Sequence, residues 1–436
     1  MTSHRKATAV SVLAASVALL VPAVSPAAAA APGPGPDRAA LQQALDATVA
    51  AGVPGAVAEV RTGRGVWHGS SGAADLATGR TTKAGDRFRA GSVTKSFTAT
   101  LVLQLVAEGK VRLDDTIEGQ LPGVVPGGEH ITVRQLLHHT SGLANYTDVL
   151  LRKPDPVRDA QKATYTPREL IALVTDAPNR PAPGTTWEYS NTNFVVLGLL
   201  VEHVTGRSLR YEMDSRIMRP LHLKGTSFPT TPSIPGSHVH GYEWLDGRGA
   251  GAAPTDLTEF SPAAYWATGT LISTTHDLNT FYKALFDGRL LPPRLVREMR
   301  AMQPMNPGRP GRSYGLGLES DANTCAADGP VVGHTGEVAG YQTFSFTSAD
   351  GERQVTLSVN TGLTLSDAAA TAAMKVLYRS LPSRTSGGRH RAPSLGRLTV
   401  STHSFRRTLG LRRGPRSELL TVRRACAPGV GVERGT

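Results

Sequence analysis

A serine and a lysine stand three residues apart in the stretch Phe88–Phe97, where an apolar helical pattern begins after Ser92 and contains Lys95. Residues at this spacing share one face of a helix, so the two side chains can meet near its N-terminus. A serine hydroxyl attacks a carbonyl only when a base and oxyanion donors stand beside it. The helix N-terminus favours developing negative charge, and an apolar floor helps to keep a lysine amine neutral. Taken alone, the pair favours a helix-capping serine over a nucleophile.

Two further motifs favour the nucleophile over the cap. Tyr189 and Asn191 form the one Tyr-x-Asn among ten tyrosines, and His334-Thr335-Gly336 is the one His-Thr-Gly in the chain. A tyrosine beside a cation can relay a proton, and an asparagine amide can bind both lysine and a substrate amide. His-Thr-Gly on a strand offers charge, a hydroxyl and close backbone approach. Together with Ser92 and its lysine, these residue types predict acyl transfer.

The elements that must position these residues are read from hydrophobic periodicity. A helix is expected after Asp37, and residues 55–72 predict a first hairpin. Alternation on both sides of Asp350-Gly351 predicts a second hairpin, followed by an Ala-rich helix over 365–381. Strands near both chain ends predict an α+β fold, with one antiparallel sheet built from both ends, flanking helices and a helical insertion at about 110–260.

The chain begins with a basic start and an apolar run, followed by small residues that offer cleavage sites. This order predicts a secretory signal peptide over 1–31 and a secreted protein, with a membrane anchor as the alternative. We place the hydrolase domain at 32–380. Residues 381–436 form an Arg-rich, flexible tail that carries ten of the twelve net positive charges, with attachment to an anionic cell-wall polymer as its alternative role.

Charge and cysteine content narrow the function classes further. The signal segment carries the other two net positive charges, so residues 32–380 balance to zero, and we expect no nucleic-acid partner for the folded body. Cys325 and Cys426 are the two cysteines of the chain. They can pair in an oxidising compartment, but two cysteines do not make a disulfide scaffold, and the pairing stays open.

At these motifs the sequence resembles the penicillin-recognising serine hydrolases. Ser92-Val93-Thr94-Lys95, Tyr189-Ser190-Asn191 and the His-Thr-Gly at 334–336 look like that family's three motifs in order. The flanking stretches "DRFRAGSVTKSF", "LLHHTSGL", "PGTTWEYSNTNFVVLG" and "YGLGL" are most similar to the secreted D-alanyl-D-alanine carboxypeptidases related to class C β-lactamases. The resemblance covers about 37–380 and implies a β-lactamase/transpeptidase-like fold.

The resemblance also implies a role for each matched residue. Ser92 would be the acylated nucleophile, with Lys95 and Tyr189 as proton-transfer partners, and which of the two takes the first proton is left open. The backbone N–H groups of Ser92 and Glu337 would form the oxyanion hole. The substrate-binding residues would be Asn191 for the substrate amide, His334 for electrostatic help, Thr335 for a hydrogen bond and Gly336.

The implied activity is a serine-type D-Ala-D-Ala carboxypeptidase that acts on peptidoglycan peptide ends, with β-lactams as inhibitors or substrates. We expect a monomer without metal or organic cofactor. One stretch departs from the family: Glu319, Ser320 and Asp321 stand where related carboxypeptidases can carry arginine. A desolvated carboxylate needs a cation, so esterase or D-amino-acid amidase or peptidase activity on the same fold is the alternative. The non-enzymatic alternatives are a penicillin-binding sensor and a wall-binding protein.

Two other catalytic interpretations are weaker. Gly311-Arg312-Ser313-Tyr314-Gly315 matches the G-x-S-x-G nucleophile elbow, but the motif leads from a Pro/Gly loop into an expected strand rather than from a strand into a helix. The pairs His238/His240 and His138/His139 lack the spacing and the partners of a metal site.

Overall fold

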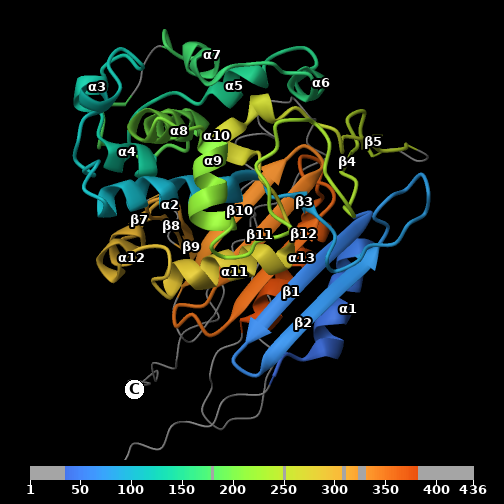
Figure 1. Cartoon of the computed structure of the whole chain (residues 1–436). Coiled ribbons are helices and arrows are strands. Elements are labelled where there is room, and N and C mark those ends of the chain that lie inside the picture. Colours follow the sequence, from blue (N-terminus) through green and yellow to red (C-terminus); the bar gives the residue numbers. More distant parts are fainter. Residues whose placement is uncertain (1–34, 178–180, 249–251, 307–310, 323–329, 382–436) are drawn as a thin grey trace, which may run out of the picture. The chain divides into compact units, whose positions relative to one another are not determined.

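The structure is a computed structural model that describes residues 35–177, 181–248, 252–306, 311–322 and 330–381 (Figure 1). The predicted signal peptide, both cysteines and the Arg-rich tail after Leu381 lie outside the described residues. Within the described ranges, no helix is both long enough and apolar enough to cross a membrane.

A large antiparallel sheet with strands in the order β2-β1-β12-β11-β10-β9-β8-β7 forms the centre of the fold. Strand β1 pairs with β12, with Ala56 opposite Val359, so segments from both ends of the domain join in one sheet. The predicted α+β class and the sheet built from both chain ends are therefore confirmed. The strands are β1 Gly55–Thr62, β2 Gly65–Gly72, β7 Gln303–Pro304, β8 Arg312–Tyr314, β9 Glu319–Asp321, β10 Val331–Val338, β11 Tyr341–Thr347 and β12 Gln354–Val359.

Two terminal helices, α1 (Arg38–Ala50) and α13 (Asp367–Ser380), pack together against this sheet and share one apolar core with it. Asp37 caps α1 through a hydrogen bond from the Ala40 N–H, as the sequence predicts, and Ser366 caps α13 in the same way. Helix α11 (Thr275–Phe286) packs on strands β1, β11 and β12. Helices therefore flank the sheet as predicted (Figure 1).

The second and larger core joins the buried helices α2 (Thr94–Ala107) and α8 (Asn191–Thr205). The remaining helices are α3 Ile117–Gln120, α4 Val133–His138, α5 Tyr146–Leu150, α6 Pro156–Gln161, α7 Pro167–Ala172, α9 Leu209–Met213, α10 Trp266–Gly269 and α12 Pro293–Met299. Two short strand pairs complete the fold: β3 (Phe88–Arg89) with β6 (Ile272–Ser273), and β4 (Tyr242–Glu243) with β5 (Thr255–Asp256). The segment predicted as a helical insertion contributes α3 to α9 and the pair β4–β5.

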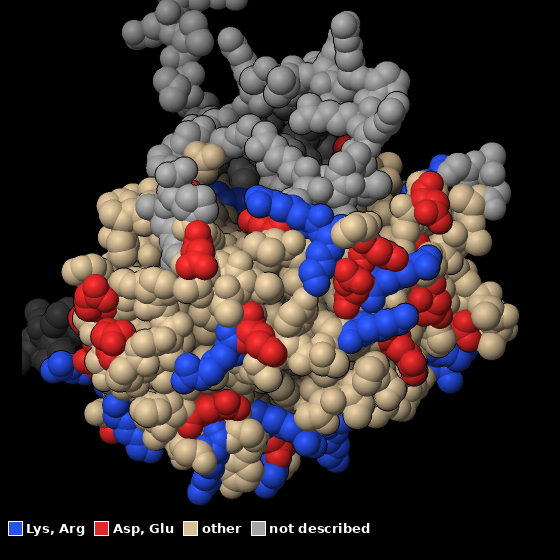
Figure 2. Space-filling view, turned by 90° about the horizontal axis from the view of Figure 1, so that it is seen from above, with Lys and Arg blue, Asp and Glu red and all other residues tan. Residues whose placement is uncertain are grey.

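Charged side chains of both signs are interspersed over the face seen in Figure 2. This distribution agrees with the zero net charge of residues 32–380, which was read from the sequence. The described part of this face therefore carries no extended surface of one sign that would attract a polyanion.

A buried carboxylate fixes the turn that follows β10. Glu243 of β4 is fully buried, and its carboxylate accepts backbone N–H groups from Gly340 at 2.8 Å, Gly362 at 2.9 Å, Leu363 at 2.7 Å and Thr364 at 2.8 Å. These donors satisfy a charge that would otherwise be costly to bury. The carboxylate therefore ties the β10–β11 turn to the loop after β12.

Replacing Glu243 by Gln should lower the free energy of unfolding by about 2–3 kcal/mol, because an amide NH₂ then faces several N–H donors. Urea unfolding followed by circular dichroism measures the change. The control is Glu298→Gln at a half-exposed ion pair with Arg134, where the change should stay within about 0.5 kcal/mol. An unchanged midpoint for the Glu243 variant would contradict this account.

Candidate active site

Ser92 lies in a single 3₁₀ turn, Gly91–Val93, directly before α2. No side-chain hydrogen bond caps either this turn or α2, and the Thr94 hydroxyl donates to the Gly91 carbonyl at 2.7 Å. The alternative role of Ser92 as a helix cap is therefore not seen. Its hydroxyl faces two polar side chains instead.

Lys95 and Tyr189 both reach the Ser92 hydroxyl. The Lys95 Nζ lies 3.1 Å and the Tyr189 hydroxyl 2.9 Å from the Ser92 Oγ. A third contact, from the Lys95 Nζ to the Thr268 carbonyl at 2.8 Å, holds the amine in place. Three residues that are separated by up to 97 positions thus meet at one oxygen.

Burial shifts the pKa values of Lys95 and Tyr189 in opposite directions. Lys95 is fully buried, and this burial lowers its pKa well below its ordinary value, with Glu319 opposing the shift. Burial raises the pKa of Tyr189 far above its ordinary value, partly offset by the hydrogen bond to Ser92. Burial therefore favours the neutral, basic form of the amine and the protonated form of the phenol.

These pKa directions and the contacts at the Ser92 Oγ favour one order for the first proton transfer, which the sequence left open. A neutral Lys95 amine can donate one N–H to the Thr268 carbonyl and accept the Ser92 proton with its lone pair. The Tyr189 hydroxyl donates to the same Oγ and is available as a proton donor later in the reaction. Lys95 is the base that this geometry favours.

Asn191 begins α8, two residues after Tyr189, and is almost fully buried. Its amide Nδ2 donates to the Thr147 hydroxyl at 3.1 Å, and its backbone N–H donates to the Asn145 Oδ1 at 2.9 Å. The resemblance implies a contact with the substrate amide. In this structure the Asn191 Nδ2 is engaged with Thr147.

The edge of the site opposite α2 is the strand β10. An added Cβ at Gly91 would lie 2.7 Å from the Glu337 nitrogen, and one at Gly336 would lie 2.0 Å from the Ala90 carbonyl oxygen and 3.3 Å from the Ser92 nitrogen. Both glycines therefore permit the close backbone approach that brings the two predicted oxyanion donors, the N–H groups of Ser92 and Glu337, to the same place.

The buried Glu319 carboxylate accepts the Thr335 hydroxyl, the group to which the resemblance assigns a hydrogen bond with the substrate. Although burial opposes ionisation of its carboxyl, His334, Arg312 and hydrogen bonds from Thr335 together lower its pKa. The Thr335 hydroxyl donates to the two Glu319 oxygens at 2.9 and 3.0 Å, and the Arg312 Nη2 lies 2.8 Å from Oε2. The hydroxyl and the nearby cation are thus both engaged by a side chain of the protein.

His334 is fully buried beside this carboxylate. Burial lowers its pKa, with Glu319 opposing the shift, and its Nε2 lies 3.0 Å from the Tyr314 hydroxyl. Near neutral pH, electrostatic help from His334 would therefore come from a neutral, hydrogen-bonded ring. Sequence reasoning did not assign roles to Tyr314 or Arg312, although the alternation in "RSYGLGLES" was a signal for strand residues near the site.

Local structure shows how the residues of the two rival interpretations are placed. Ser313 lies in β8, which continues to β9 without an intervening helix, so the nucleophile-elbow geometry is absent there. His240 pairs with Asp256 at 2.8 Å, and His138 lies 3.2 Å from the Ala301 carbonyl. Among the described residues, no group of three or more His, Cys, Asp or Glu side chains is arranged to hold a metal ion.

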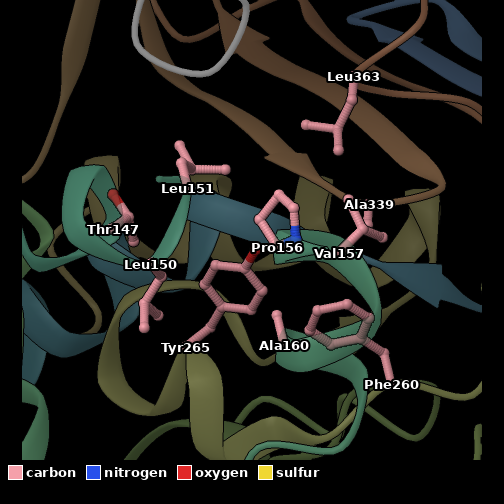
Figure 3. Close-up of a pocket in the computed structure, with 10 residues that line it drawn as sticks. All are labelled: Thr147, Leu150, Leu151, Pro156, Val157, Ala160, Phe260, Tyr265, Ala339 and Leu363. Carbon is pink, nitrogen blue, oxygen red and sulfur yellow. The ribbon is translucent and has the colours of Figure 1, made fainter. Parts of the chain in front are cut away.

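A narrow apolar pocket adjoins the site (Figure 3). It meets the catalytic region at Thr147, which accepts from Asn191, and at Ala339, which directly follows β10. The volume inside is about 10 Å³, room for about one water-sized group. The lining residues are Thr147, Leu150, Leu151, Pro156, Val157, Ala160, Phe260, Tyr265, Ala339 and Leu363.

The fold has a central antiparallel sheet with flanking helices, and it brings Ser-x-x-Lys, Tyr-x-Asn and His-Thr-Gly together around Ser92. These features define a class of serine hydrolases. The chain belongs to the Beta-lactamase family, whose model matches residues 40–378. The resemblance read from the sequence is thereby confirmed.

Individual relatives differ in the activities that their names state. The structure is similar to a D-stereospecific amidohydrolase from Streptomyces sp., with 39% identity, a TM-score of 0.70, and coverage of 78% of this chain and 98% of that one. Penicillin-binding protein 4 of Amycolatopsis lactamdurans is 28% identical over 244 residues, which are 55% of this chain and 61% of the relative. Esterase EstB of Burkholderia gladioli is 35% identical over 187 residues, which are 40% and 47% of the two chains. The matched stretches span between 38% and 64% of the curated relatives' lengths.

Removal of the Ser92 hydroxyl, the Lys95 amine or the Tyr189 hydroxyl should lower kcat/KM by about 10³-fold or more, because the three groups act as a unit. The variants are Ser92→Ala, Lys95→Ala and Tyr189→Phe, assayed by hydrolysis of p-nitrophenyl acetate. The Lys95/Tyr189 double variant should lose no more than the worse single variant. Ser313→Ala is the control and should keep nearly full activity. Losses that multiply in the double variant would argue against one shared proton-transfer network.

The activity should rise with pH as Lys95 loses its proton. Because burial lowers the Lys95 pKa, kcat/KM for a neutral ester should reach its plateau well below the ordinary lysine pKa of 10.5. Tyr189 should cause no loss over the same range, because its raised pKa keeps the phenol protonated. A pH-stat profile measures this. Activity that appears only near pH 10 would contradict a neutral Lys95 base.

Proposed function

We propose that this serine hydrolase is an amidase or esterase that transfers D-aminoacyl groups to Ser92 and releases a neutral leaving group. The observation that carries the proposal is the contact between Glu319 and the Thr335 hydroxyl. A carboxylate already accepts the hydroxyl that would otherwise bind the free carboxylate of a peptide end. An incoming carboxylate would meet a like charge there, which costs free energy in a buried site.

Arg312 does not remove this obstacle. Its guanidinium is paired with Glu319 at 2.8 Å, and the Glu319 side chain is 7% exposed, so the cation is already balanced. The amine or alcohol that leaves from a simple amide or ester carries no carboxylate, so it requires no cation in the site. The site is therefore better matched to a neutral leaving group than to a C-terminal D-alanine.

The reaction follows from the contacts at the Ser92 Oγ. As Oγ bonds to the substrate carbonyl carbon, its proton passes to the Lys95 Nζ and the carbonyl electron pair moves onto the oxygen, between the N–H groups of Ser92 and Glu337. The tetrahedral intermediate then collapses. The bond to the leaving nitrogen or oxygen breaks, and the proton that Lys95 took from Ser92 passes to that atom through the Tyr189 hydroxyl. Water then attacks the acyl-enzyme, with the same groups moving protons in the opposite order.

The comparisons support the D-aminoacyl part of the proposal. Of the relatives described above, the Streptomyces protein is a D-stereospecific amidohydrolase by name, and this chain covers nearly its whole length at 39% identity. Esterase EstB supports tolerance of an ester leaving group. Neither name states which acyl side chain the present site accepts.

A second candidate is the D-Ala-D-Ala carboxypeptidase implied by the sequence, with peptidoglycan peptide ends as substrates and β-lactams as acylating ligands. The similarity to a penicillin-binding protein favours it. It predicts a benzylpenicillin adduct on the wild type that is absent from Ser92→Ala, and turnover of D-Ala-D-Ala ends at least equal to that of their amides.

Substrate comparison tests the proposal directly. Wild-type kcat/KM should be at least about tenfold higher for a D-alanyl amide or methyl ester than for the matching free-carboxylate dipeptide. Glu319→Gln removes the negative charge with little change of shape, so this ratio should shift by about tenfold towards the free carboxylate. Asp321→Asn on the same strand is the matched control and should leave the ratio unchanged. A wild-type preference for the free carboxylate would overturn the proposal.

A further inference from the structure

His139 is a buried residue next to the catalytic tyrosine, and no step described above uses it. It ends α4 with φ at +60°, in the left-handed region, and its side chain is fully buried. A non-glycine residue pays for this conformation, so a compensating interaction is expected. The backbone groups that hydrogen-bond to His139 belong to the residues directly before and after Tyr189 in the chain.

His139 accepts hydrogen bonds from the residues directly before and after Tyr189 in the chain. The His139 carbonyl accepts the N–H of Glu188 at 2.9 Å, and the ring Nδ1 accepts the N–H of Ser190 at 3.2 Å. The backbone is thus fixed directly before and directly after the tyrosine. The imidazole ring itself lies 4.4 Å from the Tyr189 ring, measured between centroids.

The surrounding donors determine which ring nitrogen carries the proton. Asn193 accepts the Ser141 hydroxyl with its Oδ1 at 2.6 Å, so its Nδ2 is the group that faces the His139 Nδ1 at 3.1 Å. With two N–H donors directed at Nδ1, this nitrogen has to be the acceptor, and the proton is on Nε2.

A neutral imidazole is also what the environment favours. Burial lowers the pKa of His139 well below its ordinary value. The Nε2 has no hydrogen-bond partner among the described residues. The His139 ring packs against the rings of Tyr314 and Phe194, whose centroids lie 4.7 and 5.3 Å from its own. The ring is therefore held by its Nδ1 side and by aromatic packing.

We propose that His139 is a positioning residue that sets the distance from the Tyr189 hydroxyl to the Ser92 Oγ through its two hydrogen bonds to the neighbouring peptide groups. The inference rests on the Ser92 acyl transfer proposed above, but not on the identity of the substrate. A phenol displaced by about 1 Å can cost about 100-fold in rate, which is the size of effect to look for.

Two substitutions separate the ring acceptor from the backbone conformation. Glycine and asparagine both tolerate a positive φ, so neither adds backbone strain at position 139. The Asn Oδ1 is the same number of bonds from Cβ as the histidine Nδ1 and can accept the Ser190 N–H, whereas glycine offers no acceptor. A difference between the two variants therefore reports the loss of a side chain that carries an acceptor at this place, without a change in backbone strain.

The full chain is assayed with p-nitrophenyl acetate, with Ser92→Ala subtracted as a blank. His139→Gly should lower kcat about 100-fold with KM changed less than about threefold, and His139→Asn should stay within about tenfold of the wild type. In a Tyr189→Phe background, His139→Gly should cost less than about threefold more, because the hydroxyl that it positions is absent. His138→Asn is the neighbouring control and should keep full activity.

Each alternative outcome is decisive. Equal kcat for folded His139→Gly and His139→Asn, or an undiminished effect of His139→Gly in the Tyr189→Phe background, would overturn the positioning role. If the glycine variant does not fold, His139→Gln replaces it. Glutamine carries its acceptor one bond further out, so wild-type-like kcat for it would equally overturn the inference. Because the assay uses a generic ester, failure of the D-aminoacyl amidase proposal would leave this result unaffected.

Discussion

The desolvation of the Lys95 amine is the constraint on which the rest of the site depends. An ammonium group with no water around it is costly, and the described contacts offer Lys95 only the Ser92 hydroxyl and the Thr268 carbonyl as hydrogen-bond partners. The amine therefore favours its neutral, basic form. The buried helix α2, which carries Lys95 on its first turn, is what excludes the water, so the largest core of the domain also tunes the base.

The second requirement is close approach between the nucleophile turn and strand β10. Gly91 and Gly336 remove the side chains that would hold the two backbones apart. Beyond Glu337, the Glu243 carboxylate ties the turn after β10 to the loop after β12 through four backbone N–H groups. The Glu337 N–H thus lies on a strand whose following turn is held in place, which contributes to the preorganisation that acyl transfer needs.

The proposed preference for a neutral leaving group depends on the charge of Glu319. Glu319 engages both Thr335 and Arg312, and it also opposes the fall in the Lys95 pKa. One carboxylate therefore engages the Thr335 hydroxyl and acts on the base, and under the proposed function it also disfavours a substrate with a free carboxylate. On the far side of the nucleophile, His139 fixes the peptide groups around Tyr189, so the proton donor is held by a residue that does not contact Ser92 in the described structure.

The sequence alone determined the α+β class, the terminal helices, both hairpins and the three motifs, because periodicity, turn residues and residue spacing are local signals. It named Ser92, Lys95 and Tyr189, which the structure brings to one oxygen atom. Only the tertiary structure showed that burial favours Lys95 as the base. It also showed that Asn191 donates to the Thr147 hydroxyl and that the Thr335 hydroxyl donates to the Glu319 carboxylate. Burial, protonation and hydrogen-bond partners depend on residues far apart in the chain, and no local pattern encodes them.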